Sequence, residues 1–246
     1  MFVLGLFTCI VLRAFSAQAK VVVSFDDCKG FFYKDTEPGG MDQNAKKICQ
    51  KLESDHYYYA TLYSVHGRIP LYSAYIFDPE CSSTAGRTEN WHIEPQTLIR
   101  KLEKKQSISS DYSDSGYDHG LLNPNSFQCD EGRIATFTLT NAAPMDESFN
   151  RIHWKNWERA LRSFLRSKLD SHGGSATVYI VTGTVPDDDV RIPLKGTSED
   201  PERVTVPSHI WTAVCYKHHL NDTNSFSFGY IGKNQLSETL SMLTLK

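Results

Sequence analysis

The sequence has no long hydrophobic run beyond its first eleven residues, so nothing later in the chain is expected to cross a bilayer. It has no excess of positive charge either, because 26 Lys and Arg residues face 29 Asp and Glu residues. A negative net charge of −3 does not indicate nucleic-acid binding, which would have to come from a local basic patch. Internal repeats and linkers are also missing, so we expect a single folded domain over residues 20–246.

The apolar start of the chain is followed by a small-x-small tripeptide at residues 17–19, which is typical of a signal-peptidase site. The positive residues that usually precede such a run are missing, and Arg13 follows it instead. Residues 1–19 are therefore either a signal peptide that is cut before Lys20 or an uncleaved membrane anchor. Because the run is shorter than the roughly 20 residues of a spanning helix, we expect cleavage and a soluble, secreted or lumenal protein.

Most cysteines of a secreted chain should be paired. Five cysteines follow the predicted signal peptide, and because this number is odd, one is free, bonds another chain or has lost its partner. Their spacing does not give the connectivity. Asn221 begins an Asn-Asp-Thr sequon in a polar stretch, which predicts an N-linked glycan on an exposed loop. The five cysteines are Cys28, Cys49, Cys81, Cys129 and Cys215.

The expected strands and helices are mixed without a regular β-α-β rhythm. We therefore predict an α+β fold with a mostly antiparallel central sheet flanked by helices. The Ser- and Asp-rich segment 106–116 is expected to be a mobile surface loop. The expected strands are 20–25, 57–64, 71–77, 133–140, 176–185, one within 204–216, and 226–231. The expected helices are 43–52, 96–105, 151–169 and 235–245.

The strongest predicted helix, 151–169, has an apolar face that must pack on the sheet and a basic stripe beside that face. The stripe is either an ordinary solvated face or a ridge that binds phosphates. At the head of the helix, Asn150 is either an N-cap or a metal ligand whose side-chain oxygen suits Mg²⁺. The basic stripe consists of Arg151, Lys155, Arg159, Arg162 and Arg166.

Two stretches in the middle of the chain have a characteristic paired spacing. The first is Asp118-His119-Gly120-Leu121-Leu122-Asn123-Pro124, and the second comprises Asn141, Pro144, Asn150, Trp154, Glu158 and Arg162. On these residues the chain resembles the DNA/RNA non-specific endonucleases, including the secreted endonuclease domain-containing proteins of vertebrates. These proteins belong to the His-Me finger, or ββα-metal, class. The first motif of the family reads Asp-Arg-Gly-His-Leu-x-Pro, so Asp118 and Pro124 keep its spacing.

The resemblance implies a fold and a metal site. In this class one strand carries the motif histidine, a second strand follows, and a helix carries the metal-binding Asn. Segments 133–140 and 151–169 would be that second strand and that helix. Asn150 would bind one divalent cation, Mg²⁺ or Mn²⁺, and Glu158 would support the water shell of the ion. No organic cofactor is implied.

The resemblance also implies residues that act on the substrate, DNA or RNA. Arg162 would face the phosphate, and Arg159 lies on the same stripe. Asn141 would help to hold the site, and Asp118 keeps the acidic position of the first motif. His119 stands where the family has a substrate-contacting Arg.

Leu121 departs from the family at the position that should carry the chemistry. The family has a His there, which takes a proton from water so that the resulting hydroxide attacks the phosphorus. Leucine cannot accept a proton, and loss of general-base help costs about 10²–10⁴-fold in rate. Residues two apart on a strand point to the same side, so His119 is a candidate substitute base. Its Cα would nevertheless lie about 6–7 Å from that of Leu121.

Two functions from different classes follow. The chain is a secreted, metal-dependent endonuclease whose hydrolysis of phosphodiesters is reduced or lost. Alternatively, it is a pseudonuclease that acts as a nucleic-acid- or protein-binding module. A third hypothesis, a ligand of cell surfaces without a nucleic-acid role, is supported only by the acidic net charge.

Overall fold

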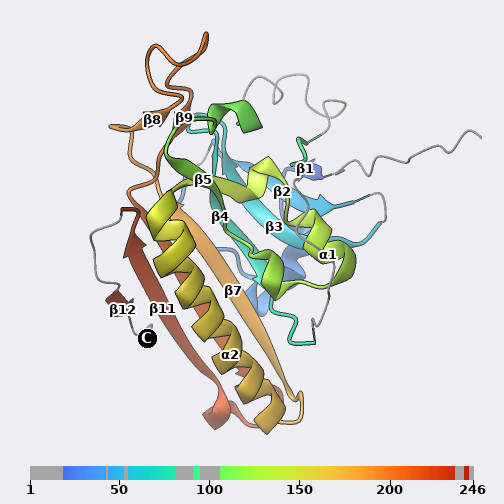
Figure 1. The fold of residues 1–246 in the computed structure, drawn as a ribbon. Coiled ribbons are helices and arrows are strands. Elements are labelled where there is room, and N and C mark those ends of the chain that lie inside the picture. Colours follow the sequence, from blue (N-terminus) through green and yellow to red (C-terminus); the bar gives the residue numbers. More distant parts are fainter. Residues whose placement is uncertain are drawn as a thin grey trace, which may run out of the picture.

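The centre of the molecule is an eight-stranded antiparallel sheet in a computed structural model that describes residues 19–42, 44–52, 55–80, 91–94, 106–235 and 241–243. Its strands are β1 (Lys20–Val22), β2 (Lys46–Lys51), β3 (Tyr57–Ser64), β4 (Ile69–Ile76), β7 (Ala176–Val185), β10 (His209–His218), β11 (Phe226–Lys233) and β12 (Ser241–Leu243). The spatial order is β1-β2-β3-β4-β7-β10-β11-β12, as Figure 1 shows. The predicted α+β class with a mostly antiparallel sheet is confirmed.

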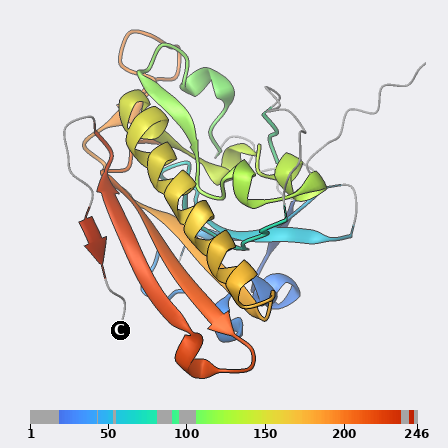
Figure 2. The same ribbon diagram turned by 60° about the horizontal axis from the view of Figure 1, so that its bottom comes forward.

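Helix α2 (Lys155–Ser171) covers one face of this sheet, diagonally across β7 and β11 (Figures 1 and 2). Leu161, Leu165 and Leu169 recur every four residues, which places them on one stripe of the helix. They pack against Ile180 of β7 and Val214 of β10 in the largest buried core cluster. This packing fixes the rotation of α2, and thereby the direction in which its basic stripe points.

The N-terminal half of the sheet contains one confirmed and one wrong prediction. The expected pair of strands at 57–64 and 71–77 is the β3–β4 hairpin. The helix expected at 43–52 is wrong, because β2 runs through it between β1 and β3. Cys49 of β2 is fully buried and forms a disulfide with Cys28, with the two Cα atoms 5.9 Å apart. Pairing on both edges and the cross-link outweigh the local preference for a helix.

A small ββα unit lies between β4 and β7 in the chain. It consists of β5 (Tyr117–Leu121), β6 (Ala142–Asp146), the π-helical turn η8 (Phe149–Trp154) and then α2. The strand expected at 133–140 is wrong. That segment contains the end of helix α1 (Asp130–Ala135) and leads into the 3-10 turn η7 (Leu139–Asn141). Tyr59 in the large sheet donates a hydrogen bond to the Ala135 carbonyl, which anchors the end of the helix.

The segment 106–116 lies partly on the surface, as expected, but buried side chains anchor it, so the expectation that it is mobile is wrong. Gln106, Ser107, Asp111 and Tyr112 are buried, and the short turn η5 (Ser109–Asp111) lies within the segment. Asp111 forms an ion pair of 3.3 Å with Arg203, whose side chain is largely buried. A buried carboxylate with a cationic partner holds the segment in place.

Other predictions fall at the margins of the described residues. The helix expected at 235–245 is wrong for residues 241–243, because these residues form strand β12, which pairs with β11. The segments 1–18 and 96–105 and the residue Cys81 lie outside the described residues. Within the described part of the chain, no helix is both long and apolar enough to span a bilayer.

The remaining elements are short. The strands β8 and β9 form a separate ribbon, and single turns of 3-10 helix join the larger elements. They are β8 (Arg191–Ile192), β9 (Val204–Thr205), η1 (Asp26–Phe31), η2 (Tyr33–Asp35), η6 (Asn125–Phe127) and η9 (Asp222–Asn224).

Candidate functional site

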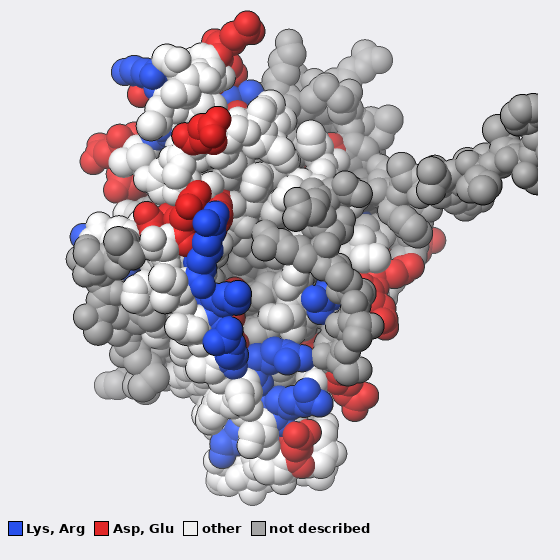
Figure 3. Space-filling model, in the orientation of Figure 1, with Lys and Arg blue, Asp and Glu red and all other residues white. Residues whose placement is uncertain are grey.

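A cleft of about 800 Å³ opens between β5 and the start of α2, and both sequence motifs contribute to it. Its cationic wall is visible in Figure 3 as a column of Lys and Arg side chains along α2. The residues that line the cleft are Trp91, Asp118, His119, Leu121, Pro124, Asn125, Ser126, Phe137, Asn150, Arg151, Lys155, Glu158, Arg159 and Arg162. Every predicted site residue of the two motifs is among them except Asn141.

Strand β5 forms the floor of the cleft. In the β5–β6 ladder, His119 stands opposite Pro144 and Leu121 opposite Ala142. Gly120, between them, faces the core, and a Cβ at that position would lie 2.2 Å from Cγ of Met145. The motif glycine is therefore required by this close approach, which leaves His119 and Leu121 on the cleft side.

Asp118 forms hydrogen bonds to two residues of the π-helical turn η8, directly before α2. Its carboxylate accepts two hydrogen bonds from Arg151, at 2.9 Å from Nε and 2.7 Å from one terminal nitrogen. Asn150 Nδ2 donates to the same carboxylate at 2.9 Å. Sequence analysis missed this contact, because its partners are 32 residues or more apart and neither motif spacing nor composition links them.

Asn150 lies inside the π-helical turn η8, whose N-cap residue is Ser148, so the N-cap interpretation is wrong. Such turns frequently occur at functional sites. Because the amide nitrogen of Asn150 is engaged by Asp118, the oxygen end of the amide remains to meet a cation. Among the described residues, no group of three or more His, Cys, Asp or Glu side chains could hold a metal ion. A single Asn oxygen beside a carboxylate fits Mg²⁺, which keeps several of its waters, better than a structural zinc ion.

Glu158 is half-buried on the cleft wall. Burial raises the pKa of its carboxyl group to about 8, although the indole N–H of Trp154 and the charge of Lys155 oppose the shift. The group therefore holds a proton at neutral pH when no cation is near. A divalent cation in the cleft would favour the ionised form.

His119 is clamped between two aromatic rings. Its ring stacks on Trp91 at a centroid distance of 4.4 Å and on Tyr112 at 3.9 Å, with interplanar angles of 21° and 22°. Its Nε2 atom is buried. Trp91 and Phe137 are cleft residues that sequence analysis missed, since no motif spacing connects them to β5.

The basic stripe forms one wall of the cleft. Four of its five members line the cleft, and Arg166 is the exception. Arg151 is neutralised by Asp118 and by Glu147, which lies 3.1 Å away. Arg162 donates from Nε to the Ser126 carbonyl at 3.0 Å. Lys155 and Arg159 are exposed and remain the cations best placed to meet a phosphate.

Asn141 is fully buried beneath the cleft rather than on its surface. Its side-chain oxygen accepts hydrogen bonds from Ser73 and from the backbone of Asn123, and its nitrogen donates to Asn123 and Thr136. All four bonds are 3.0 Å or shorter. This residue fastens the loop after β5 to the large sheet.

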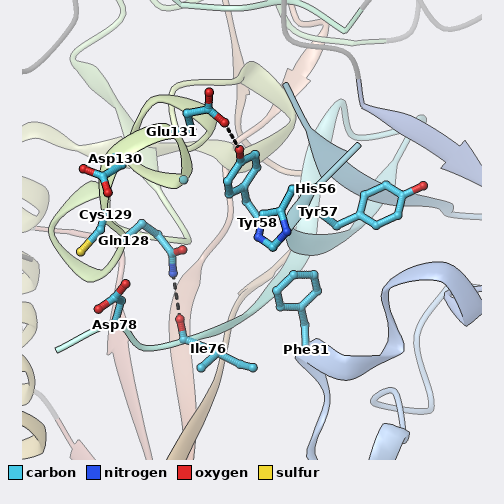
Figure 4. Close-up of a pocket in the computed structure, with 11 residues that line it drawn as sticks. Phe31, His56, Tyr57, Tyr58, Ile76, Asp78, Gln128, Cys129, Asp130 and Glu131 are labelled. Atoms are coloured by element: carbon cyan, nitrogen blue, oxygen red, sulfur yellow. Dashed lines mark hydrogen bonds between the residues drawn. The ribbon is translucent and has the colours of Figure 1, made fainter. Parts of the chain in front are cut away.

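A second hollow, of about 510 Å³, is lined by none of the motif residues; Figure 4 shows the side chains around it. Tyr58 bonds to Glu131 across it, and Gln128 donates to the Ile76 carbonyl at 3.0 Å. Three carboxylate side chains and no Lys or Arg are among the described residues that line it. A hollow of this charge does not suit phosphate, so the candidate site is the cleft on α2.

Comparisons with known proteins identify the family of the chain. A family model described as "DNA/RNA non-specific endonuclease" matches residues 39–241. The human Endonuclease domain-containing 1 protein is 36% identical over 211 residues, which cover 78% of this chain and 39% of that protein. Its mouse counterpart is 32% identical over 209 residues, with the same coverage of 78% and 39%. This chain therefore spans well under half the length of these relatives.

The fold has a counterpart among solved structures. A chain in the crystal structure of the EndoG/EndoGI complex matches with a TM-score of 0.55 and 22% identity, over 75% of each chain. At this identity the match concerns the fold alone.

Proposed function

The chain belongs to the DNA/RNA non-specific endonuclease family, and from this premise we propose that its cleft binds nucleic acid but hydrolyses it very slowly. The observation that supports slow hydrolysis is the position of Leu121, which lines the cleft where the family motif has its general base. An alkyl side chain cannot remove a proton from water. Hydrolysis would lose the factor of about 10²–10⁴ that such a base supplies.

The metal site is proposed at Asn150, for one Mg²⁺ or Mn²⁺ ion, with Glu158 hydrogen-bonding the water around it. The ion, when bound, would stabilise negative charge on the phosphate and on the leaving oxygen. Asp118 holds the amide of Asn150 by its nitrogen, so the oxygen keeps its orientation. Arg159 and Arg162 would position the phosphate from the same wall of the cleft.

His119 is a poor substitute for the missing base. General-base catalysis needs a ring nitrogen within hydrogen-bond reach of the attacking water. The ring of His119 is held flat between Trp91 and Tyr112, and its Nε2 atom is buried. We therefore assign His119 to the substrate-binding wall. The alternative function, a pseudonuclease that acts only by binding, uses the same cleft and the same cations.

Binding to DNA is expected to weaken with salt and to depend on Arg159. Each phosphate contact contributes about −0.9 to the slope of log K against log salt on duplex DNA. Arg159→Ala should reduce the steepness of this slope by about that amount. The slope is measured by fluorescence anisotropy of a labelled oligonucleotide between about 50 and 200 mM salt, in EDTA.

Arg166 provides the matched control, because it lies on the same helix face but does not line the cleft. Arg166→Ala should leave affinity and slope close to those of the unmodified protein. Equal losses in the two variants would contradict a specific role for the cleft and indicate general attraction to a basic helix.

We also propose that residues 1–19 are removed as a signal peptide, that residues 20–246 form one secreted domain, and that Asn221 carries a glycan. The Cys28–Cys49 disulfide supports an oxidising compartment. Asn221 caps η9 on the surface, and its side-chain oxygen accepts a hydrogen bond of 2.8 Å from the Thr223 hydroxyl. Protein from the medium of mammalian cells should begin at Lys20 and lose mass with a glycosidase. Asn221→Gln should not show that loss, whereas a cell-retained chain that keeps its leader would contradict secretion.

A further inference from the structure

Three aromatic rings stack at the cleft, with a buried ring at one end and a partly buried ring at the other. His119 occupies the middle, with Tyr112 on one side and Trp91 on the other. Tyr112 is 5% exposed, so its end of the stack is sealed inside the protein. Trp91 is only partly buried and lines the cleft. The end of the stack that lines the cleft is therefore the indole of Trp91.

Trp91 is also held in place from the side. The buried ring of Phe137 meets it edge-on, at a centroid distance of 5.8 Å and an interplanar angle of 74°. An aromatic ring that is already fixed loses little conformational entropy when a flat ligand stacks on it. This arrangement suits a recognition surface better than a freely rotating surface tryptophan would.

The cleft combines this aromatic end with a cationic wall. Lys155 and Arg159 on α2 line the same space as Trp91. A positively charged groove together with aromatic rings is the combination that binds single-stranded nucleic acid, since the groove follows the backbone and bases stack on the rings. In a duplex, both faces of each base are already covered by its neighbours. Only an unpaired base can lie on Trp91.

We propose that Trp91 is a stacking platform for one unpaired nucleobase and that the cleft prefers single-stranded nucleic acid to duplex. This proposal rests on the proposed function, in that the cleft binds nucleic acid at all. His119 is the positioning residue of the platform, because its ring supports the inner face of Trp91. It replaces a family arginine, whose charge would contact phosphate, with a flat ring that extends the stack.

The test uses the metal-free protein in EDTA, so that hydrolysis does not interfere. A short single strand carrying 2-aminopurine and a blunt duplex of that strand with its complement, which has no unpaired loop, are titrated with protein. Trp91→Ala should weaken single-strand binding about 10-fold and leave duplex binding unchanged. It should also abolish the quenching of 2-aminopurine fluorescence, a readout that responds to stacking on the base.

Two further variants separate stacking from folding. Trp91→Phe keeps an aromatic face and should retain most of the affinity and the quenching, whereas Trp91→Leu should lose both. Trp157 stacks on Tyr230 and does not line the cleft, so Trp157→Phe is the matched control and should behave like the unmodified protein. Thermal unfolding of each variant confirms that the fold is retained.

The outcomes are distinguishable. If Trp91→Leu binds the single strand as well as Trp91→Phe does, or if both substitutions weaken single-strand and duplex binding equally, the platform is refuted. In that case a loss of affinity in Arg159→Ala would still support nucleic-acid binding by the cleft. If the unmodified protein binds neither strand form, the proposed function itself fails.

Discussion

Leu121→His is expected to raise the rate of plasmid nicking in Mg²⁺ or Mn²⁺ by about 10²-fold or more over the unmodified protein. Leu121 lines the cleft with Asn150 and Glu158, so an imidazole at this position would project into the same space. The substitution supplies a proton acceptor whose pKa lies near neutral pH, which is the function the cleft lacks. Quantifying supercoiled and nicked plasmid over time measures the gain.

Asn150→Ala is the control for this experiment. In the Leu121→His background it should remove the gain, because a base without the proposed cation ligand cannot complete the site. Efficient cutting by the unmodified protein, abolished by Asn150→Ala, would show that hydrolysis does not need a base at position 121. No gain from Leu121→His would mean that the cleft lacks more than its base.

The second large effect concerns stability at alkaline pH. Glu94 is only 5% exposed and accepts a hydrogen bond of 2.7 Å from the Thr140 hydroxyl. In the chain that retains Ala19, whose backbone N–H also donates to Glu94 at 3.1 Å, burial raises the pKa of this carboxyl group to about 7, although both hydrogen bonds oppose the shift. In the unfolded chain the pKa of a glutamate is about 4.3. The folded state therefore binds the proton more tightly, and this contribution to stability is complete only below the unfolded pKa.

As the pH rises from about 4.5 through 7, the unfolded chain releases the proton before the folded protein does, so the free energy of unfolding falls by about 3 kcal/mol. Glu94→Gln cannot ionise and should escape this loss. Urea unfolding should find the two proteins similar near pH 5 and the variant more stable by about 3 kcal/mol near pH 8.5. Glu199, an exposed glutamate, gives the control, and Glu199→Gln should change stability at neither pH. A constant difference between Glu94→Gln and the unmodified protein at both pH values would contradict the ionisation argument.

The residues named through the family resemblance stay a prediction as a site, but the fold does bring them together. Asp118, Leu121, Asn150, Glu158 and Arg162 all line one cleft, because β5 and the start of α2 face each other across it. The long strands were predictable. Strand β7 occupies the predicted residues 176–185, since its β-branched run needs no information from elsewhere in the chain.

The errors share a physical cause. Residues 43–52 contain good helix formers, but hydrogen bonds to β1 and β3 decide their conformation. Residues 133–140 alternate as a strand would, yet the Asn141 amide donates to the Thr136 carbonyl and folds the segment back. In the first case the deciding partners lie on other strands. In the second, the bond to Asn141, the next residue after the segment, acts together with Tyr59 of β3, which donates to the Ala135 carbonyl from outside the window in which propensity acts.

The pairing of β4 with β7 affects which substitutions this protein can accept. These two strands are neighbours in the sheet, with Tyr72 opposite Gly183, although about a hundred residues of chain separate them. Every described residue that lines the cleft, from Trp91 to Arg162, lies in the segment between these two strands. The supporting sheet is completed by what comes before and after it. Substitutions at cleft residues such as Leu121 can therefore change the chemistry of the site without altering a strand of the sheet, whereas Leu161 and Asn141, which pack on or bond to the sheet, are constrained by folding.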